Sequence, residues 1–140
     1  MTRRKNKYMK KKPTAKYVDG YVLPVPKKRV AEYRKMARDA GKIWMKHGAL
    51  SYKECMGDDL TPDMKGYPYF PFRTMIKAKP NETVWYSYIE YKSKTHRDQV
   101  NKKVMKEMEA YMKEHPDHMK DMPWDMKRCA YGGFKVIVDA

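Results

Sequence analysis

The segment Thr83–Tyr91, TVWYSYIEY, is the clearest strand in the sequence, and it is apolar on both of its faces. Successive side chains of a strand point to opposite faces, so alternation gives two sets: Trp85, Ile89 and Tyr91, and Val84, Tyr86 and Tyr88. A strand with one face in water normally carries polar residues at every second position. The chain must therefore cover both faces of this strand, which restricts the folds open to it.

The remaining elements follow from periodicity. Apolar residues at steps of three and four predict helices, and alternating or β-rich segments predict strands. The predicted elements are strands over Lys16–Val25, Leu50–Met56, Thr83–Tyr91 and Lys127–Val138, and helices over Lys27–Lys46 and from Thr95 to Glu114. The order βαββαβ predicts an α+β, ferredoxin-like fold, a four-stranded antiparallel sheet with two helices on one face.

Local signals set the ends of these helices. Gly48 follows Lys46 and His47 and predicts a left-handed cap on the first helix. Thr95 and Asp98 fit a capping box at the start of the second helix. Residues 57–72 are dense in Gly, Pro and Asp and are expected to form a long loop, either a plain connection or a lid, after which residues 73–78 begin to pair as a strand.

Two helices on one face leave the other sheet face open, with aromatic side chains on it. A large apolar patch is unusual on a soluble monomer, so we expect a homodimer in which two sheets pack face to face as a dimeric α/β barrel. The neighbouring Gly132 and Gly133 have two interpretations. They form a bulge that serves curvature and packing, or they shape the floor of a ligand pocket.

The net charge of +15 is unevenly distributed along the 140 residues. Residues 1–16 carry eight Lys or Arg and no acid, so residues 1–15 are expected to be a disordered basic tail before one domain over residues 16–140. The tail is either a solubilising or expression-related segment or a non-specific arm for RNA, DNA or an anionic surface. Its candidate contacts are Arg3, Arg4, Lys5, Lys7, Lys10, Lys11 and Lys12.

Composition indicates an aromatic, soft core, because 13 Met, 12 Tyr and 3 Trp offset a low aliphatic content. Cys55 and Cys129 have no CxxC spacing and are expected to be reduced thiols. No segment approaches the ~18 consecutive apolar residues of a membrane span. We therefore expect a cytoplasmic protein with no membrane contact.

Several blocks resemble the YbaA-like bacterial family of unknown function: YVDGYVLPVPKK, HGALSYKEC, DD, YKSKTHRDQVNKKVM and MPWDMKRCAYGGFKVIV. The resemblance extends from about Lys16 to Ala140. It implies a dimeric α/β barrel of the ferredoxin-like group, whose wider membership includes cofactor-free monooxygenases, dehydratase-like proteins and haem-handling proteins. It implies no catalytic residues, and the basic tail and the MKGYPYFPF loop depart from the family pattern.

No segment carries a catalytic signature, so the sequence leaves open whether the protein is an enzyme. The first hypothesis is a homodimer with a small cavity between sheet and helices, which binds or transforms a small organic molecule without a metal or other cofactor. The candidate lining residues are Tyr21, His47, Ser87, Arg128, Tyr131, Gly132 and Gly133, with the histidine or a tyrosine handling a proton. The second is a nucleic-acid-associated protein that uses the tail, and the third is a structural or interaction dimer.

Two other chemistries have weaker support in the sequence. His115 and His118 stand among methionines, which suits copper, but the intervening Pro116 fixes no common helical face, so no metal is expected. Aromatic residues on a ferredoxin-like sheet could stack RNA bases. However, the RNP1 pattern is absent from the sequence, and a face-to-face dimer would occupy that surface.

Overall fold

The computed structural model describes residues 14–140. Its elements are, in chain order, β1 (Tyr17–Pro26), the 3₁₀ turn η1 (Lys27–Arg29), α2 (Val30–Lys46), β2 (Ser51–Met56), α3 (Phe72–Met75), β3 (Glu82–Tyr91), α4 (Lys94–Glu114), the 3₁₀ turns η2 (Pro116–Met119) and η3 (Met126–Arg128), and β4 (Ala130–Lys135). The predicted tail contacts, Arg3 to Lys12, lie outside the described residues, and the interpretations of the tail stay predictions.

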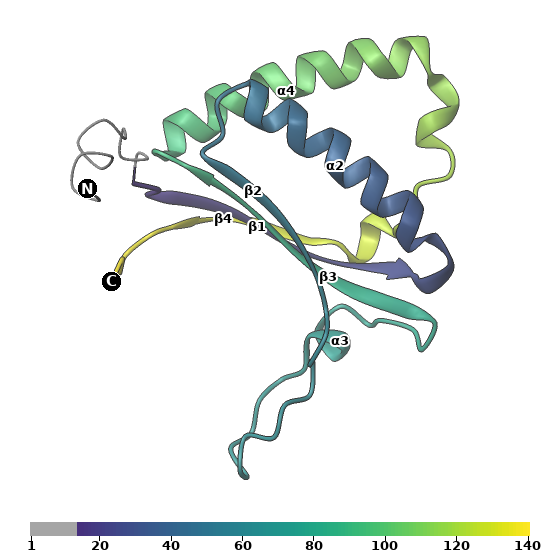
Figure 1. The fold of residues 1–140 in the computed structure, drawn as a ribbon, viewed down its shortest axis with the longest axis vertical. Helices are drawn as coiled ribbons and strands as arrows, with labels where there is room; N and C mark the ends of the chain where they lie inside the picture. The colour runs from purple at the N-terminus through teal and green to yellow at the C-terminus, as the bar shows by residue number, and fades with distance from the viewer. Residues whose placement is uncertain (1–13) are drawn as a thin grey trace, which may run out of the picture.

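The strands form one antiparallel sheet with the order β2-β3-β1-β4, and α2 and α4 cover the same face of it (Figure 1). The predicted α+β class and the four-stranded antiparallel sheet are confirmed. α2 connects β1 to β2, and α4 connects β3 to β4. Neither pair of strands is adjacent in the sheet, and β1 and β3 lie at the centre of the sheet. In the register, Tyr21 of β1 stands opposite both Ser87 of β3 and Tyr131 of β4.

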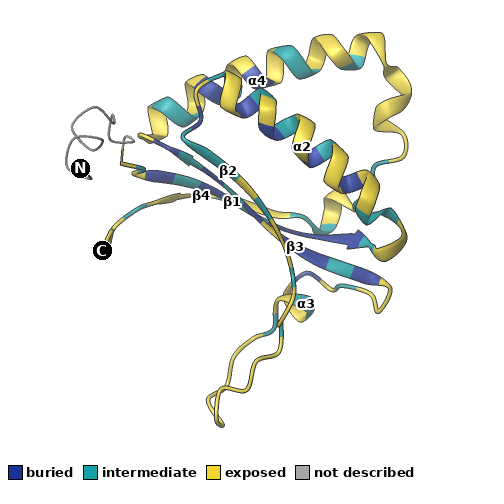
Figure 2. Cartoon of the chain, viewed as in Figure 1, coloured by how far each residue is buried: buried dark blue, intermediate teal, exposed yellow. Residues whose placement is uncertain are grey.

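Two hydrophobic clusters fill the layer between the helices and the sheet. Tyr17, Ile89 and Tyr91 of the sheet pack with Trp44 of α2 and with Val100 and Val104 of α4. Leu23, Val25 and Trp85 pack with Tyr33 and Ala37 of α2. The apolar spacing that predicts the helices places Val100, Val104, Met108 and Tyr111 on one buried stripe of α4; Val100 and Val104 are buried, but Tyr111 is exposed. Each helix buries one side against the sheet (Figure 2).

The prediction for the C-terminal end of α2 is confirmed, whereas the prediction for the start of α4 is wrong. Gly48 has φ +109°, and the N–H groups of Gly48 and Ala49 donate to the carbonyls of Met45 and Trp44, so the predicted left-handed cap is confirmed. The predicted Thr95–Asp98 capping box is wrong. Ser93 is the N-cap, and its hydroxyl accepts a hydrogen bond from the His96 N–H at 3.0 Å.

Two predicted β segments also differ from the structure. Residues 73–78 do not pair as a strand, because Phe72–Met75 forms one helical turn after Pro71 and Ile76 then packs against the sheet. The last strand is shorter than Lys127–Val138. Its beginning is replaced by η3, where the Asp125 carboxylate accepts from the Lys127 N–H at 2.9 Å, and pairing starts only at Ala130.

The face of the sheet opposite the helices is covered only in part. Ile76 buries Val22 and Val84 on this face. Elsewhere on it, Tyr86 is 46% exposed and Phe134 is 63% exposed. The loop between β2 and α3 extends away from the sheet and leaves this area uncovered (Figures 1 and 2). The described chain therefore does not cover both faces of β3 by itself.

Gly132 and Gly133 are explained by aromatic packing on opposite faces of β4. The register with β1 continues without interruption through both glycines, so they form no bulge. A Cβ at Gly133 would lie 2.9 Å from ring carbons of Tyr17 on the helix side. On the open side, the Phe134 ring lies over Gly132 and its partner Gly20, at 3.8 and 3.4 Å from the Cβ positions. The predicted bulge is therefore wrong, and the pair is explained by close packing of aromatic rings instead.

We predict that Gly133→Ala lowers the free energy of unfolding by about 1–3 kcal/mol, because the buried Tyr17 ring must move to make room. Gly132→Ala is the matched control. Its new methyl group would make an ordinary contact with Phe134, and we expect no destabilisation. Urea denaturation of the two variants measures the difference, and equal stability would contradict the packing explanation.

Candidate functional site

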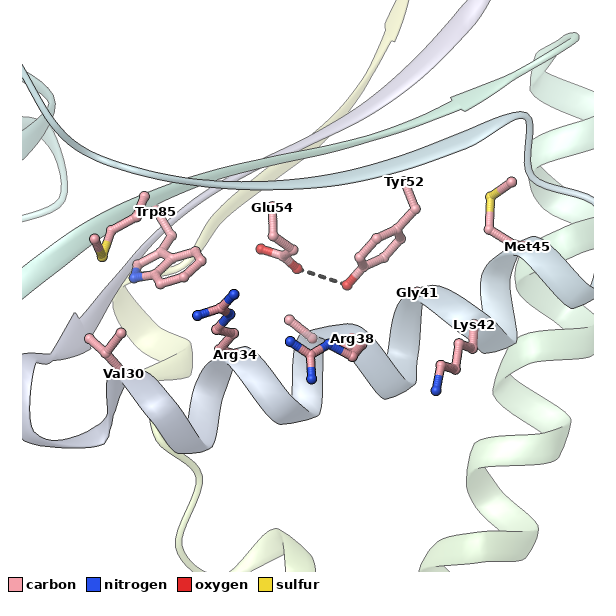
Figure 3. Close-up of a pocket in the computed structure, with 11 residues that line it drawn as sticks. Val30, Arg34, Arg38, Gly41, Lys42, Met45, Tyr52, Glu54 and Trp85 are labelled. Carbon is pink, nitrogen blue, oxygen red and sulfur yellow. Dashed lines mark hydrogen bonds between the residues drawn. The ribbon is translucent and has the colours of Figure 1, made fainter. Parts of the chain in front are cut away.

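A pocket of about 620 Å³ opens between α2 and the edge strand β2 (Figure 3). This volume is within the range of about 300–1,000 Å³ that is usual for small-molecule sites. One wall is α2, and the other is the helix-facing side of β2 and β3. The lining residues are Val30, Arg34, Ala37, Arg38, Gly41, Lys42, Met45, Tyr52, Glu54, Met56 and Trp85.

The α2 wall is basic at its rim. Arg34, Arg38 and Lys42 are spaced by four residues, so they lie on one side of the helix, next to the small residues Ala37 and Gly41 that face the sheet. All three cations are exposed, and within residues 14–140 none of the ion pairs involves them. The pocket therefore presents a positive potential to an approaching ligand.

The sheet wall is aromatic and is fixed by hydrogen bonds. The Trp85 ring packs edge-on against Tyr33 with a centroid separation of 4.8 Å. Its indole N–H donates to the Thr83 hydroxyl at 3.0 Å. Tyr52 packs close to α2, where a Cβ at Gly41 would lie 2.8 Å from its ring. These contacts hold the rings of the pocket floor in defined orientations.

Glu54 is the acidic group of the pocket, and three hydroxyls donate to its carboxylate. Tyr33 donates to Oε2 at 2.8 Å, Tyr52 donates to Oε1 at 2.7 Å, and Ser87 also donates to Oε2. Burial, and second to it the charge of Glu54, raises the pKa of the Tyr33 and Tyr52 hydroxyls well above the ordinary value. Both tyrosines therefore remain protonated donors at neutral pH.

A second buried carboxylate joins α4 to the sheet. Asp19 of β1 is fully buried and accepts from Arg97 Nη1 at 2.8 Å and from the Tyr131 hydroxyl at 3.4 Å. Burial raises the pKa of the Asp19 carboxyl above its ordinary value. The Arg97 guanidinium also lies over the Tyr17 ring, 5.0 Å from its centroid. This cluster anchors the first turn of α4 on β1 and β4.

Three of the predicted lining residues come together on the helix side of the sheet. Tyr21, Ser87 and Tyr131 occupy neighbouring strands at the same register position, and Tyr21 stacks on Tyr131 with ring centroids 4.7 Å apart. Ser87 contacts Glu54 directly. None of the three lines the pocket itself, which lies further toward β2.

The other predicted residues lie elsewhere. His47 is at the C-terminal end of α2, with its Nε2 3.2 Å from Glu107 of α4. Arg128 binds both carboxylate oxygens of Glu82, at 2.6 and 2.8 Å, and also binds Asp125. Gly132 is on the open face, and Gly133 lies under Tyr17. The structure therefore does not bring the seven predicted residues to one place.

None of the residues that line the pocket is among the seven predicted from the sequence. Glu54 could have been found, because it is an acid on the inward-facing positions of the alternating strand Leu50, Tyr52, Glu54, Met56. The basic side of α2 could also have been found from its spacing of four. No local pattern predicts that β2 and α2 lie side by side. Glu54 contacts Tyr33 and Ser87, which are distant from it in the sequence.

The described part of the chain contains no group of three or more His, Cys, Asp and Glu side chains placed to hold a metal ion. His115 and His118 both pack against Tyr111: His115 stacks on its ring at 4.1 Å between centroids, and His118 meets it edge-on at 5.3 Å. Between residues 14 and 140, no helix combines the length and the apolar content needed to cross a membrane.

The fold and the pocket define an α+β protein with a cleft of small-molecule size between a basic helix and an edge strand. Residues 16–126 match the family described as protein of unknown function (DUF1428), and the chain belongs to this family. It is 44% identical over 124 residues to the uncharacterized protein YbaA of Escherichia coli strain K12, covering 89% of this chain and 98% of the relative. YbaA of Shigella flexneri matches with the same identity and coverage. The resemblance noted from the sequence is confirmed.

We predict that Arg128→Ala lowers the free energy of unfolding by about 1–2 kcal/mol at pH 7, because it leaves the buried Glu82 carboxylate without its partner. Hydrogen bonds from Arg128 hold the pKa of Glu82 below its ordinary value near 4.5. A lowered carboxyl pKa gives stability above that value and loses it as the pH falls, so the deficit should shrink below about pH 4. Urea denaturation at pH 7 and below pH 4 measures the stability deficit of the variant at each pH. Lys46→Ala is the control, because Lys46 belongs to an exposed ion pair whose loss should change stability little.

Proposed function

We propose that the protein is a ferredoxin-like protomer of a homodimeric α/β barrel, and that it binds a small organic anion in the pocket between α2 and β2. The observation that carries the ligand proposal is the combination, around one cleft, of an aromatic floor and three cations that form no ion pair with any residue of the described range 14–140. The cations attract the anionic group, and Trp85, Met56 and Met45 contact its apolar body.

The strand order and the open sheet face support the dimer. The order β2-β3-β1-β4 with both helices on one face is that of a split βαβ unit, which leaves its second face free. Tyr86 and Phe134 are exposed there, next to the part that Ile76 covers. Pairing two copies of this face would remove the exposed parts of these rings from water, which is the driving force that supports the dimer.

We predict that the wild-type protein sediments as a dimer at micromolar concentration and that Tyr86→Lys and Phe134→Lys shift it to the monomer. Each change places a charge in the proposed interface and would have to bury it there. Tyr111→Lys is the matched control, because Tyr111 is exposed to a similar degree on α4, far from this face. A wild-type protein that stays monomeric at high concentration would exclude the dimer.

The chemistry of the pocket limits the kind of ligand. Its basic rim disfavours cations, and its floor offers aromatic and thioether surface rather than a row of polar groups. A carboxylate can take paired hydrogen bonds from an arginine, which makes arginines effective anion contacts. We therefore choose phenylpropionate, an aromatic ring with a flexible carboxylate arm, as the probe.

We predict that phenylpropionate binds the wild-type protein in isothermal titration calorimetry and that Arg34→Gln or Arg38→Gln weakens binding about 3–10-fold. Met56→Trp, which fills the pocket from its exposed rim, should abolish binding. Lys35→Gln removes the same charge from α2 outside the pocket and should change affinity less than about twofold. Equal losses in Arg38→Gln and Lys35→Gln would refute a local anion site.

A further inference from the structure

Among the residues that the structure describes, the donors to the Glu54 carboxylate leave one of its hydrogen-bond acceptor positions open in the pocket. Each carboxylate oxygen accepts about two hydrogen bonds. Oε2 of Glu54 receives two, from Tyr33 and Ser87, whereas Oε1 receives one, from Tyr52. Glu54 also lines the pocket (Figure 3). A group bound in the pocket can therefore complete the set.

We propose that the pocket selects organic anions that also carry a hydroxyl group, and that Glu54 Oε1 accepts the hydrogen bond from this hydroxyl. This inference rests on the proposed function, because it specifies the ligand of the same pocket. It assigns the two ends of the ligand to different walls. The anionic group goes to α2, and the hydroxyl goes to β2.

The position of the Glu54 carboxylate is fixed before any ligand arrives. Its three donors come from different elements: Tyr33 from α2, Tyr52 from β2 and Ser87 from β3. The Tyr33 ring is held between Trp85 and Trp124, with centroid distances of 4.8 and 5.6 Å. An acceptor that is already in place costs little ordering on binding, so its contribution to affinity is large.

Tyr33 and Tyr52 act as hydrogen-bond donors to Glu54 and not as acceptors. Burial raises the pKa of Tyr33 and Tyr52, which keeps both hydroxyls protonated, and each proton is directed to Glu54. A ligand group that only accepts hydrogen bonds would face the lone pair of Oε1 with no proton between them. Such a group is rejected, as is the anionic end of the ligand itself.

Charge also argues for a neutral donor rather than an ammonium group. The side of the pocket opposite Glu54 carries Arg34, Arg38 and Lys42, and these three cations repel a ligand ammonium group in the same cleft. A hydroxyl donates a second hydrogen bond to Oε1, in addition to that from Tyr52, without adding charge. A ligand without this hydroxyl leaves one acceptor position of a partly buried carboxylate unfilled and binds less tightly.

The test compares phenylpropionate with its meta- and para-hydroxy derivatives by calorimetry. The wild-type protein should bind the better hydroxy derivative about tenfold more tightly. Glu54→Gln removes a negative charge from the pocket, so phenylpropionate should bind more tightly than to the wild type, and the preference for the hydroxy derivative, taken as the ratio of the two affinities on the variant, should fall below about threefold. Glu90→Gln is the matched control, because Glu90 is a β3 carboxylate on the open face that accepts from Ser51, and it should keep the full preference.

A second comparison needs no variant. The para-methoxy derivative has the same oxygen but no proton to donate, and it should lose the whole preference. Equal wild-type affinity for phenylpropionate and the hydroxy compounds, or a preference that persists in Glu54→Gln, would overturn the role of Glu54 and leave the anion site standing. Absence of binding by every probe would overturn both proposals.

Discussion

The arrangement of this protein depends on two carboxylates between its helices and its sheet, Asp19, which is fully buried, and Glu54, which is partly buried. Glu54 receives hydroxyls from α2, β2 and β3, and Asp19 receives Arg97 from α4 and Tyr131 from β4. Each helix is thus tied to the sheet by polar contacts within an otherwise apolar layer, and Asn101 of α4 adds another by accepting from the Tyr91 hydroxyl. Such pairs cost desolvation and contribute little net stability, but a displaced helix would leave a buried charge unpaired. They therefore specify where each helix lies.

The aromatic character of the core imposes a matching demand for small residues. Tyrosine and tryptophan rings are large, so in this layer a ring comes close to the backbone of a neighbouring element where that element has a glycine. Gly133 accommodates Tyr17, and Gly41 lets α2 approach Tyr52. Ala37, another small residue of α2, is buried against the aromatic cluster that contains Trp85, and it also lines the pocket. The pocket itself lies where small residues on α2 face an edge strand that has no further strand beyond it.

The sequence was sufficient for the parts of the fold that local periodicity determines. The steps of three and four in α2 identify Tyr33, Ala37 and Trp44 as buried, and Gly48 identifies the end of the helix. It was insufficient where two local signals compete, since Ser93 and Thr95 are both suitable caps two residues apart. It was also insufficient for the pocket, because Glu54 meets Tyr33 and Ser87 only after the sheet has formed.

The pocket divides into a floor that belongs to the core and a rim that does not. Trp85 and Ala37 are buried and support the packing of α2, whereas Arg34, Arg38 and Lys42 are exposed and support nothing else among the described residues. Exposed positions of this kind exchange at little cost to stability. Descendants of one ancestral chain can thus acquire different ligand preferences through the rim alone, while the inherited scaffold beneath stays the same.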